Sequence, residues 1–130
     1  KKAGNGIPAL FSAWPSASRR QGFPRSMESY ALAAQDVNGI LLPVAAAWLA
    51  AWDREATLDL YSDGLHPSTA GAYLSALVIH AKLLGKSPLG LPTSLTTRSG
   101  VTITLVPAVA EILQQAADQV WTSSTQTLRF

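Results

Sequence analysis

Two short apolar segments, residues 7–14 and 40–44, constrain the fold most strongly because they are the stretches most typical of buried strands. The second is apolar on both faces, which suits a parallel sheet covered by helices, although Pro43 places it at an edge or at a strand end. Helical segments follow each of them, so the order indicates an α/β fold. Because two strands alone make a poor sheet, the pattern predicts the second half of a doubly wound domain.

The longest run of helical spacing follows Ser68, which can cap a helix that Gly85 can end. We expect this helix, from about Ser68 to Leu84, to be the most buried of the chain. Its apolar side chains recur on one face: Ala70, Tyr73, Leu74, Leu77, Val78, Ala81 and Leu84.

Three further helices are expected: residues 27–37 capped by Ser26 and stopped at Asn38, residues 45–52, and residues 106–121 with Pro107 in the first turn. The connecting segments, residues 15–26 and 86–100, are predicted to be irregular.

The composition indicates one globular domain, since 48% of the 130 residues are apolar and 14% are charged. The formal charge of +2 is too small to indicate binding to nucleic acid or to a membrane surface. Arg19, Arg20 and Arg25 are predicted to be a solvated loop. No apolar run approaches the ~20 residues of a membrane span.

The chain has no cysteine, which excludes disulfides, thiolate metal sites and thiol catalysis. This fits a secreted or periplasmic protein without disulfides as well as a cytoplasmic one, so the compartment stays open. The chain begins with lysine, and we expect it to be part of a longer protein.

The turn "DGLHP" places Asp63 and His66 three residues apart, directly before the helix that follows Ser68. Gly64 permits the backbone angles of such a turn, and Pro67 keeps His66 out of helical geometry. A histidine acts as a general base when a carboxylate holds one ring nitrogen and the other reaches a nucleophile. We therefore expect the Asp63 carboxylate to contact His66 Nδ1 at the rim of a cleft.

Simpler explanations of the same residues exist. An aspartate and a histidine at this spacing also occur in solvated turns, and the turn could belong to an unrelated helical domain. A metal site is disfavoured because two ligands are too few. The second histidine, His80, is predicted to be an ordinary helix residue without a functional role.

The stretch "LYSDGLHPSTAGAYLSALVIHAKLLGKSPLG" resembles the closing block of the SGNH (GDSL-type) serine hydrolases, in which Asp-x-x-His-Pro precedes the last core helix. "PALFSAWP" is similar to the strand that leads into the family's substrate loop, and "YALAAQDVNGILLPVAAAW" to its next helix and strand. The resemblance continues to "AEILQQAADQVW" and covers nearly the whole chain. It implies that residues 1–130 are the C-terminal portion of a single three-layer, flavodoxin-like domain.

By this resemblance His66 is the general base that activates a serine, and Asp63 orients it. The implied substrates are esters of lipids, acetylated sugars or small acids, and the reaction needs no cofactor and no metal. The family's Gly-Asp-Ser nucleophile motif and its glycine and asparagine oxyanion donors do not occur in this sequence. We therefore expect the N-terminal half of the fold to supply them in cis or in trans, and the chain alone to be inactive. The alternative is a non-catalytic binding module that retains the fold.

Trp14 ends the first predicted strand, beside the long loop and on the side of the Asp63 turn. It could therefore line an acyl pocket, although a core position explains a tryptophan there equally well.

Overall fold

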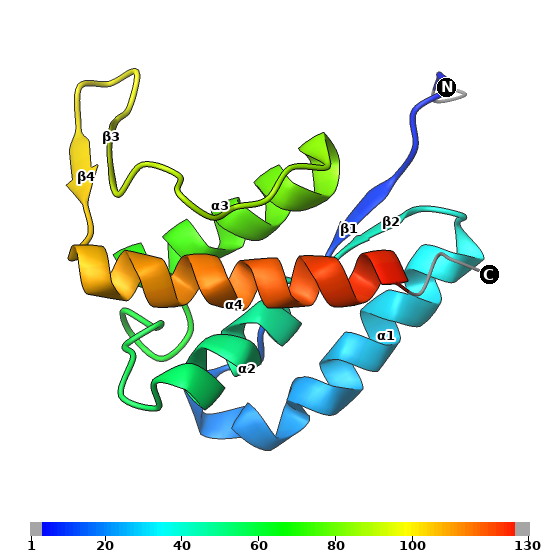
Figure 1. The fold of residues 1–130 in the computed structure, drawn as a ribbon. Helices are drawn as coiled ribbons and strands as arrows, with labels where there is room; N and C mark the ends of the chain where they lie inside the picture. The colour runs from blue at the N-terminus through cyan, green and yellow to red at the C-terminus, as the bar shows by residue number, and fades with distance from the viewer. Residues whose placement is uncertain (1–3, 127–130) are drawn as a thin grey trace.

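The computed structural model describes residues 4–126 (Figure 1). Helices and short strands are mixed along the chain, which confirms the α/β class. In chain order the elements are β1 (Ala9–Phe11), the 3₁₀ helix η1 (Ala17–Gly22), α1 (Phe23–Asp36), β2 (Ile40–Leu42), α2 (Val44–Arg54), α3 (Thr69–Leu84), β3 (Ser94–Thr96), β4 (Thr102–Thr104) and α4 (Pro107–Gln126).

β1 and β2 pair in parallel, with Ala9 opposite Ile40, and α1 connects them as in a βαβ unit. The predicted parallel pair is confirmed, although each strand has three residues and is shorter than the apolar segment that contains it. β2 ends early because Pro43, which has no N–H, stands at the N-cap of α2.

The segment 86–100, predicted to be irregular, contains β3, which pairs antiparallel with β4. Hydroxyl groups face each other across this hairpin, at 2.9 Å between Ser94 and Thr104 and at 3.0 Å between Thr96 and Thr102. The prediction is wrong for residues 94–96, because a threonine-rich segment resembles a polar loop, whereas β-branched threonine also favours strands.

α1 begins at Phe23, earlier than predicted, because Pro24 fits the first turn, where its missing N–H has no helical partner. Ser26 therefore lies inside the helix and is not its cap; its hydroxyl donates to the Ala13 carbonyl at 3.0 Å. Since η1 precedes α1, most of the expected loop over residues 15–26 is helical. Asn38, with φ of 50°, confirms the expected left-handed stop.

Both ends of α3 confirm the prediction. The Ser68 hydroxyl accepts a hydrogen bond from the Gly71 N–H at 3.2 Å at the N-terminus. At the C-terminus, Gly85 has φ of 62° and its N–H donates to the Ala81 carbonyl.

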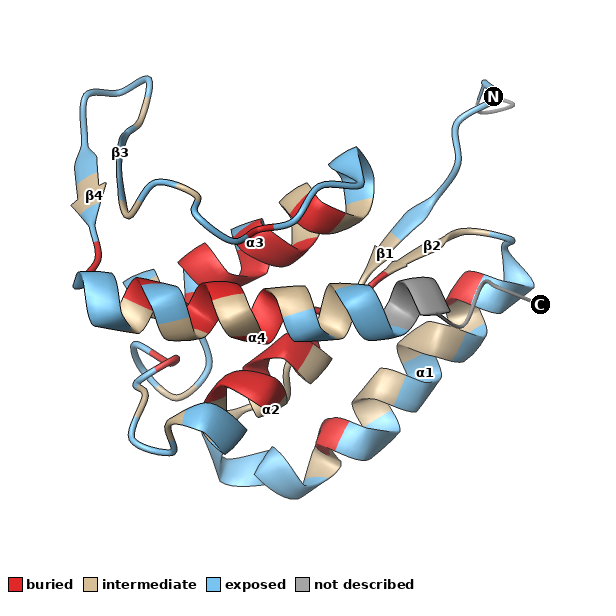
Figure 2. Ribbon diagram, in the orientation of Figure 1, coloured by how far each residue is buried: buried red, intermediate tan, exposed pale blue. Residues whose placement is uncertain are grey.

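The core lies where α2, α3 and α4 meet, and α4 runs across the other two helices (Figures 1 and 2). Six of the 11 residues of α2 are buried, against seven of the 16 residues of α3. The expectation that α3 is the most buried helix therefore holds by number of buried residues but not by fraction, because the shorter α2 packs against α1, α3 and α4 at once. Leu84, expected on the buried face of α3, is 59% exposed.

Candidate functional site

The turn that carries Asp63 and His66 is closed by backbone contacts. Ser62 N–H donates to the His66 carbonyl at 2.9 Å, and Tyr61 and Pro67 form an antiparallel bridge. Gly64 has φ of 83°, in the left-handed region that glycine adopts without strain. The residue after the bridge is the N-cap of α3, so the turn is joined directly to that helix.

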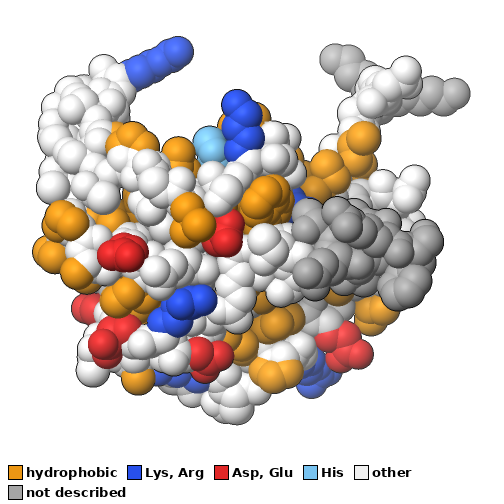
Figure 3. Space-filling view, viewed as in Figure 1, with side chains coloured by type: hydrophobic (Ala, Val, Ile, Leu, Met, Phe, Trp, Pro, Cys, Tyr) orange, Lys and Arg blue, Asp and Glu red, His pale blue; other side chains and the backbone are white. Residues whose placement is uncertain are grey.

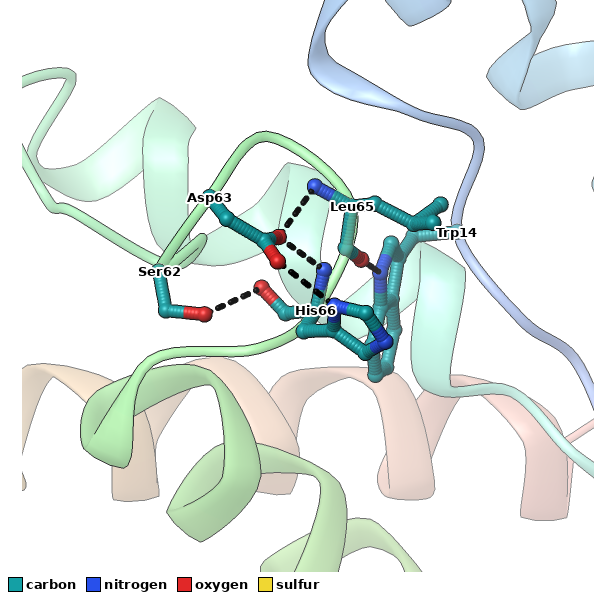
Figure 4. Close-up of polar contacts among 5 residues, drawn as sticks. All are labelled: Trp14, Ser62, Asp63, Leu65 and His66. Atoms are coloured by element: carbon teal, nitrogen blue, oxygen red, sulfur yellow. Dashed lines mark hydrogen bonds and ion pairs between the residues drawn. The ribbon is translucent and has the colours of Figure 1, made fainter.

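The Asp63 carboxylate holds both the backbone of the turn and the His66 ring (Figure 4). Its Oδ1 accepts hydrogen bonds from the backbone N–H groups of Leu65, at 2.9 Å, and His66, at 2.7 Å. Its Oδ2 lies 2.6 Å from His66 Nδ1, which confirms the predicted contact. When Nδ1–H of the neutral ring donates to the carboxylate, the ring's lone pair is on Nε2, the atom that a general base uses.

These hydrogen bonds lower the pKa of Asp63 from 3.8 to about 2. The bond to the His66 side chain contributes most, and the backbone N–H groups of His66 and Leu65 follow. Asp63 is therefore ionised at neutral pH and can stabilise a positive charge on the ring.

The His66 ring is open to solvent. Its side chain is 71% exposed and that of Asp63 is 54% exposed. Among residues 4–126, no hydroxyl donates to His66 Nε2, and the nearby Ser62 hydroxyl donates to the His66 carbonyl instead, at 3.3 Å. Among the described residues, then, Asp63 and His66 are in contact, and no hydroxyl is hydrogen-bonded to the other ring nitrogen of His66.

Three hydrogen bonds anchor the turn to the segment that follows β1. They place the turn at the carboxyl ends of the parallel strands, where open α/β sheets bind ligands. The bonds run from Trp14 Nε1 to the Leu65 carbonyl at 2.9 Å, from Ala17 N–H to the Gly64 carbonyl at 2.8 Å, and from the Tyr61 hydroxyl to the Pro15 carbonyl at 2.5 Å.

Trp14 is held between the turn and the core. Its ring stacks on that of Trp48, with centroids 4.0 Å apart and planes at 12°, and meets Phe11 edge-on. Trp14 is not among the residues that line the three cavities described below. Its lining of an acyl pocket stays a prediction, whereas its contacts show that it supports the turn that carries His66.

All three arginines are exposed, as predicted, but Arg20 also contacts two aromatic rings. Its guanidinium lies over the Trp52 ring, 3.8 Å from the centroid, and 6.0 Å from the centroid of Tyr61. η1 brings Arg20 against α2, and the attraction of a cation for an aromatic face holds it there. Burial raises the pKa of Tyr61, and the charge of Arg20 partly opposes this rise.

Three cavities beside the helices of the described residues bear on the site. One of about 370 Å³ lies between α3 and the β3–β4 hairpin and begins at Pro67. A second of about 190 Å³ lies further along α3, where His80 lines it. A third of about 440 Å³ lies between α1 and the β2–α2 segment. Neither Asp63 nor His66 lines these three cavities, although the first begins at Pro67, the residue after His66, so their place at the rim of a cleft stays a prediction.

Gln114 fixes one wall of the cavities beside α3, and sequence reasoning missed it. It is 6% exposed. Its side-chain NH₂ donates to the Tyr73 hydroxyl and the Leu91 carbonyl, both at 2.8 Å, and its oxygen accepts from the Gly90 N–H at 2.9 Å. The sequence did contain a signal for its burial, because Gln114 stands at helical spacing with the apolar Ala110 and Ala117 on the buried face of α4.

The described residues provide neither a metal site nor a membrane span. Residues 4–126 contain no group of three or more histidine, aspartate or glutamate side chains that could hold a metal ion. In the same range, no helix combines the length and the apolar character that crossing a membrane requires.

No family model and no curated protein matches this chain. Its fold is similar to the crystal structure of a DUF4886 family protein from Bacteroides uniformis, with a TM-score of 0.72 over 94% of this chain and 17% sequence identity. At that identity the likeness shows the fold alone. The chain spans 50% of the length of that protein.

Proposed function

We propose that this chain is the C-terminal part of an SGNH-type serine ester hydrolase, in which His66 is the general base and Asp63 positions and stabilises it. The observation that carries the proposal is the 2.6 Å contact between Asp63 Oδ2 and His66 Nδ1. The backbone N–H groups on Oδ1 fix the carboxylate, so it can orient the ring before a substrate arrives.

In the proposed reaction, His66 Nε2 takes the proton of a serine hydroxyl as the serine oxygen attacks the ester carbonyl. Asp63 stabilises the imidazolium that forms, and the ring returns the proton to the departing alcohol. The acyl-enzyme then reacts with water by the same steps. Backbone or side-chain donors must stabilise the oxyanion, and we assign these donors and the serine to the N-terminal half of the fold.

The two-stranded sheet supports a larger fold. Each strand of the β1–β2 pair has one neighbour among residues 4–126, so each has a free edge that further strands could join. The DUF4886 family protein with the similar fold is twice as long as the region it shares with this chain. We propose that the complete domain is a three-layer, flavodoxin-like sheet in which β1 and β2 lie beside the strands of the N-terminal half.

The test is hydrolysis of a short-chain nitrophenyl ester by the 130-residue chain and by the complete protein, or by the two halves combined. We expect no turnover by the chain alone. In the complete protein, His66→Ala should lower kcat by roughly 10³ or more, because the members of a triad act as a unit. Asp63→Asn should lower kcat less if other groups can hold the ring.

Asp36→Asn, the same change at an exposed position at the end of α1, is the matched control and should leave kcat unaltered. Turnover by the isolated chain that depends on His66 would mean that a nucleophile lies within these residues. If His66→Ala left the activity of the complete protein intact, the general-base assignment would be wrong and a non-catalytic binding module would explain the fold better.

A further inference from the structure

The two cavities beside α3 are neighbours along the helix, and together we call them the α3 groove. Both are lined by Tyr73, Ala76 and Leu95. The groove begins at Pro67, the neighbour of His66, and ends at His80. It therefore leads away from the proposed general base.

Small side chains form the floor of the α3 groove and larger ones cover it. Ala72 and Ala76 lie on the exposed side of α3, and Leu95 and Ile103 reach over them from the β3–β4 hairpin. Figure 3 shows hydrophobic side chains gathered where this hairpin meets the body of the protein. No aspartate, glutamate, lysine or arginine is among the residues that line either cavity.

Two polar groups in the wall of the groove, the hydroxyls of Tyr73 and Ser68, are already hydrogen-bonded to the protein. The Tyr73 hydroxyl donates to the Pro92 carbonyl at 3.1 Å and accepts from Gln114 at 2.8 Å. The Ser68 hydroxyl donates to the Asp59 carbonyl at 2.6 Å and accepts from the Gly71 N–H. A ligand along this wall would need few polar groups of its own, and an apolar one would leave these donors and acceptors satisfied.

The α3 groove is elongated along the helix. From Thr69 to His80 the floor follows α3 for about 16 Å, at the rise of 1.5 Å per residue of a helix. A linear hydrocarbon chain fits a path of this shape better than a compact or branched apolar group. Gln114 holds the segment at Leu91 in place, so the groove exists before any ligand binds.

We propose that the α3 groove binds a straight acyl chain, with the carboxyl end beside Pro67 and the tail toward His80. The identification of this acyl group as part of an ester substrate rests on the proposed function, whereas the binding of an acyl chain in the groove does not. The groove would then select long acyl chains over acetyl groups, because each methylene that it takes out of water adds to the affinity.

Calorimetric titration of the 130-residue chain with butyrate, octanoate and dodecanoate, each below its micelle-forming concentration, tests this directly. We expect the affinity to rise about fourfold for each methylene that enters the groove. Ala76→Phe should weaken dodecanoate binding by roughly tenfold or more, since it fills the floor that both cavities share. Leu95→Asp should also weaken binding, because it places a charge over the groove.

Ala108→Phe is the matched control. It makes the same change at an exposed position in the first turn of α4, outside both cavities, and should leave binding unaltered. Circular dichroism should show that all three variants are folded as the parent chain is. Equal affinity for the three acids, or equal weakening by Ala76→Phe and Ala108→Phe, would overturn the proposal.

The same titration separates this proposal from the esterase proposal. Chain-length-dependent binding that Ala76→Phe removes supports the acyl groove even if the complete protein hydrolyses no ester. If esterase activity depended on His66 but dodecanoate did not bind, the general-base assignment would be supported and the acyl-groove proposal would be wrong.

Discussion

Gly71 lies where α3 crosses the segment that leads into the Asp63 turn, and replacing it with alanine tests that junction. A Cβ at this position would lie 2.3 Å from the Leu60 carbonyl oxygen and 2.8 Å from a ring carbon of Trp48. Neither neighbour can move easily. The Leu60 carbonyl accepts a hydrogen bond from the Ser68 N–H at 2.8 Å, and Trp48 is fully buried.

Two effects of opposite sign determine the stability of Gly71→Ala. Alanine in an exposed helix interior would stabilise the protein by about 1 kcal/mol relative to glycine. Overpacking a closely packed site costs about 1–3 kcal/mol, and contact with a backbone carbonyl places this case at the upper end. We expect the free energy of unfolding to fall by about 2 kcal/mol.

Urea denaturation followed by tryptophan fluorescence measures this change, because Trp48 is part of the buried ring cluster. Gly22→Ala is the matched control. Its Cβ would meet Pro15 at 3.6 Å, an ordinary contact, and its backbone is already helical with φ of −82°. The control should change stability by less than about 0.5 kcal/mol. If the Gly71→Ala variant were as stable as the parent chain, α3 would not be packed as closely against the Leu60 carbonyl as described.

Three further changes probe the core, the groove and the turn. Leu77→Ala, at a position 3% exposed, should lower the free energy of unfolding by about 2–5 kcal/mol in urea denaturation; an unaltered value would mean that α3 is misplaced. Gln114→Ala should cost about 1–3 kcal/mol in the same assay, since it leaves buried partners unpaired, and a neutral result would show that water replaces the amide. The folded pKa of Asp63 is about 2 and lies below its ordinary value of 3.8, so its stabilising contribution is complete above 3.8 and is lost as the pH falls to about 2. In acid-unfolding experiments, Asp63→Asn should therefore be less stable than the parent near neutrality and equally stable below about pH 2. A difference in the free energy of unfolding that remained below about pH 2 would mean that the lost stability does not depend on the charge of Asp63.

The parts of the fold that sequence predicted are those with local chemical signals. Ser68 and Gly85 mark the ends of α3 because a hydroxyl cap and a left-handed glycine act within one turn of the helix. The start of α1 was missed because two local signals compete there. Ser26 can cap a helix, but Pro24 fits the first turn of an earlier one, and packing of the buried Phe23 favours the earlier start.

Long-range contacts could not be predicted from sequence. Threonine and serine in residues 94–104 give no indication of their partners, so the β3–β4 hairpin and the groove beneath it were missed. The position of Arg20 over Trp52 likewise depends on how η1 lies against α2. The Asp63–His66 contact was predictable because the two residues are three positions apart and the turn alone brings them together.

α3 connects the proposed general base to the proposed acyl groove, so both proposals depend on the same helix. Its cap residue, Ser68, bonds to the Asp59 and Leu60 carbonyls and thereby fixes the end of the turn that holds His66. The exposed side of the same helix is the floor of the groove. A change that shifts the N-terminus of α3 should therefore alter both sites, whereas a change on the floor should alter one.

Gly71→Ala is expected to raise the pKa of Asp63 toward its ordinary value and to weaken dodecanoate binding, while Ala76→Phe should weaken binding and leave the Asp63 titration unaltered. NMR titration of the Asp63 carboxyl in the two variants distinguishes them, and an unperturbed Asp63 in Gly71→Ala would mean that the turn is held by its anchors at Trp14 and Ala17 and not by α3.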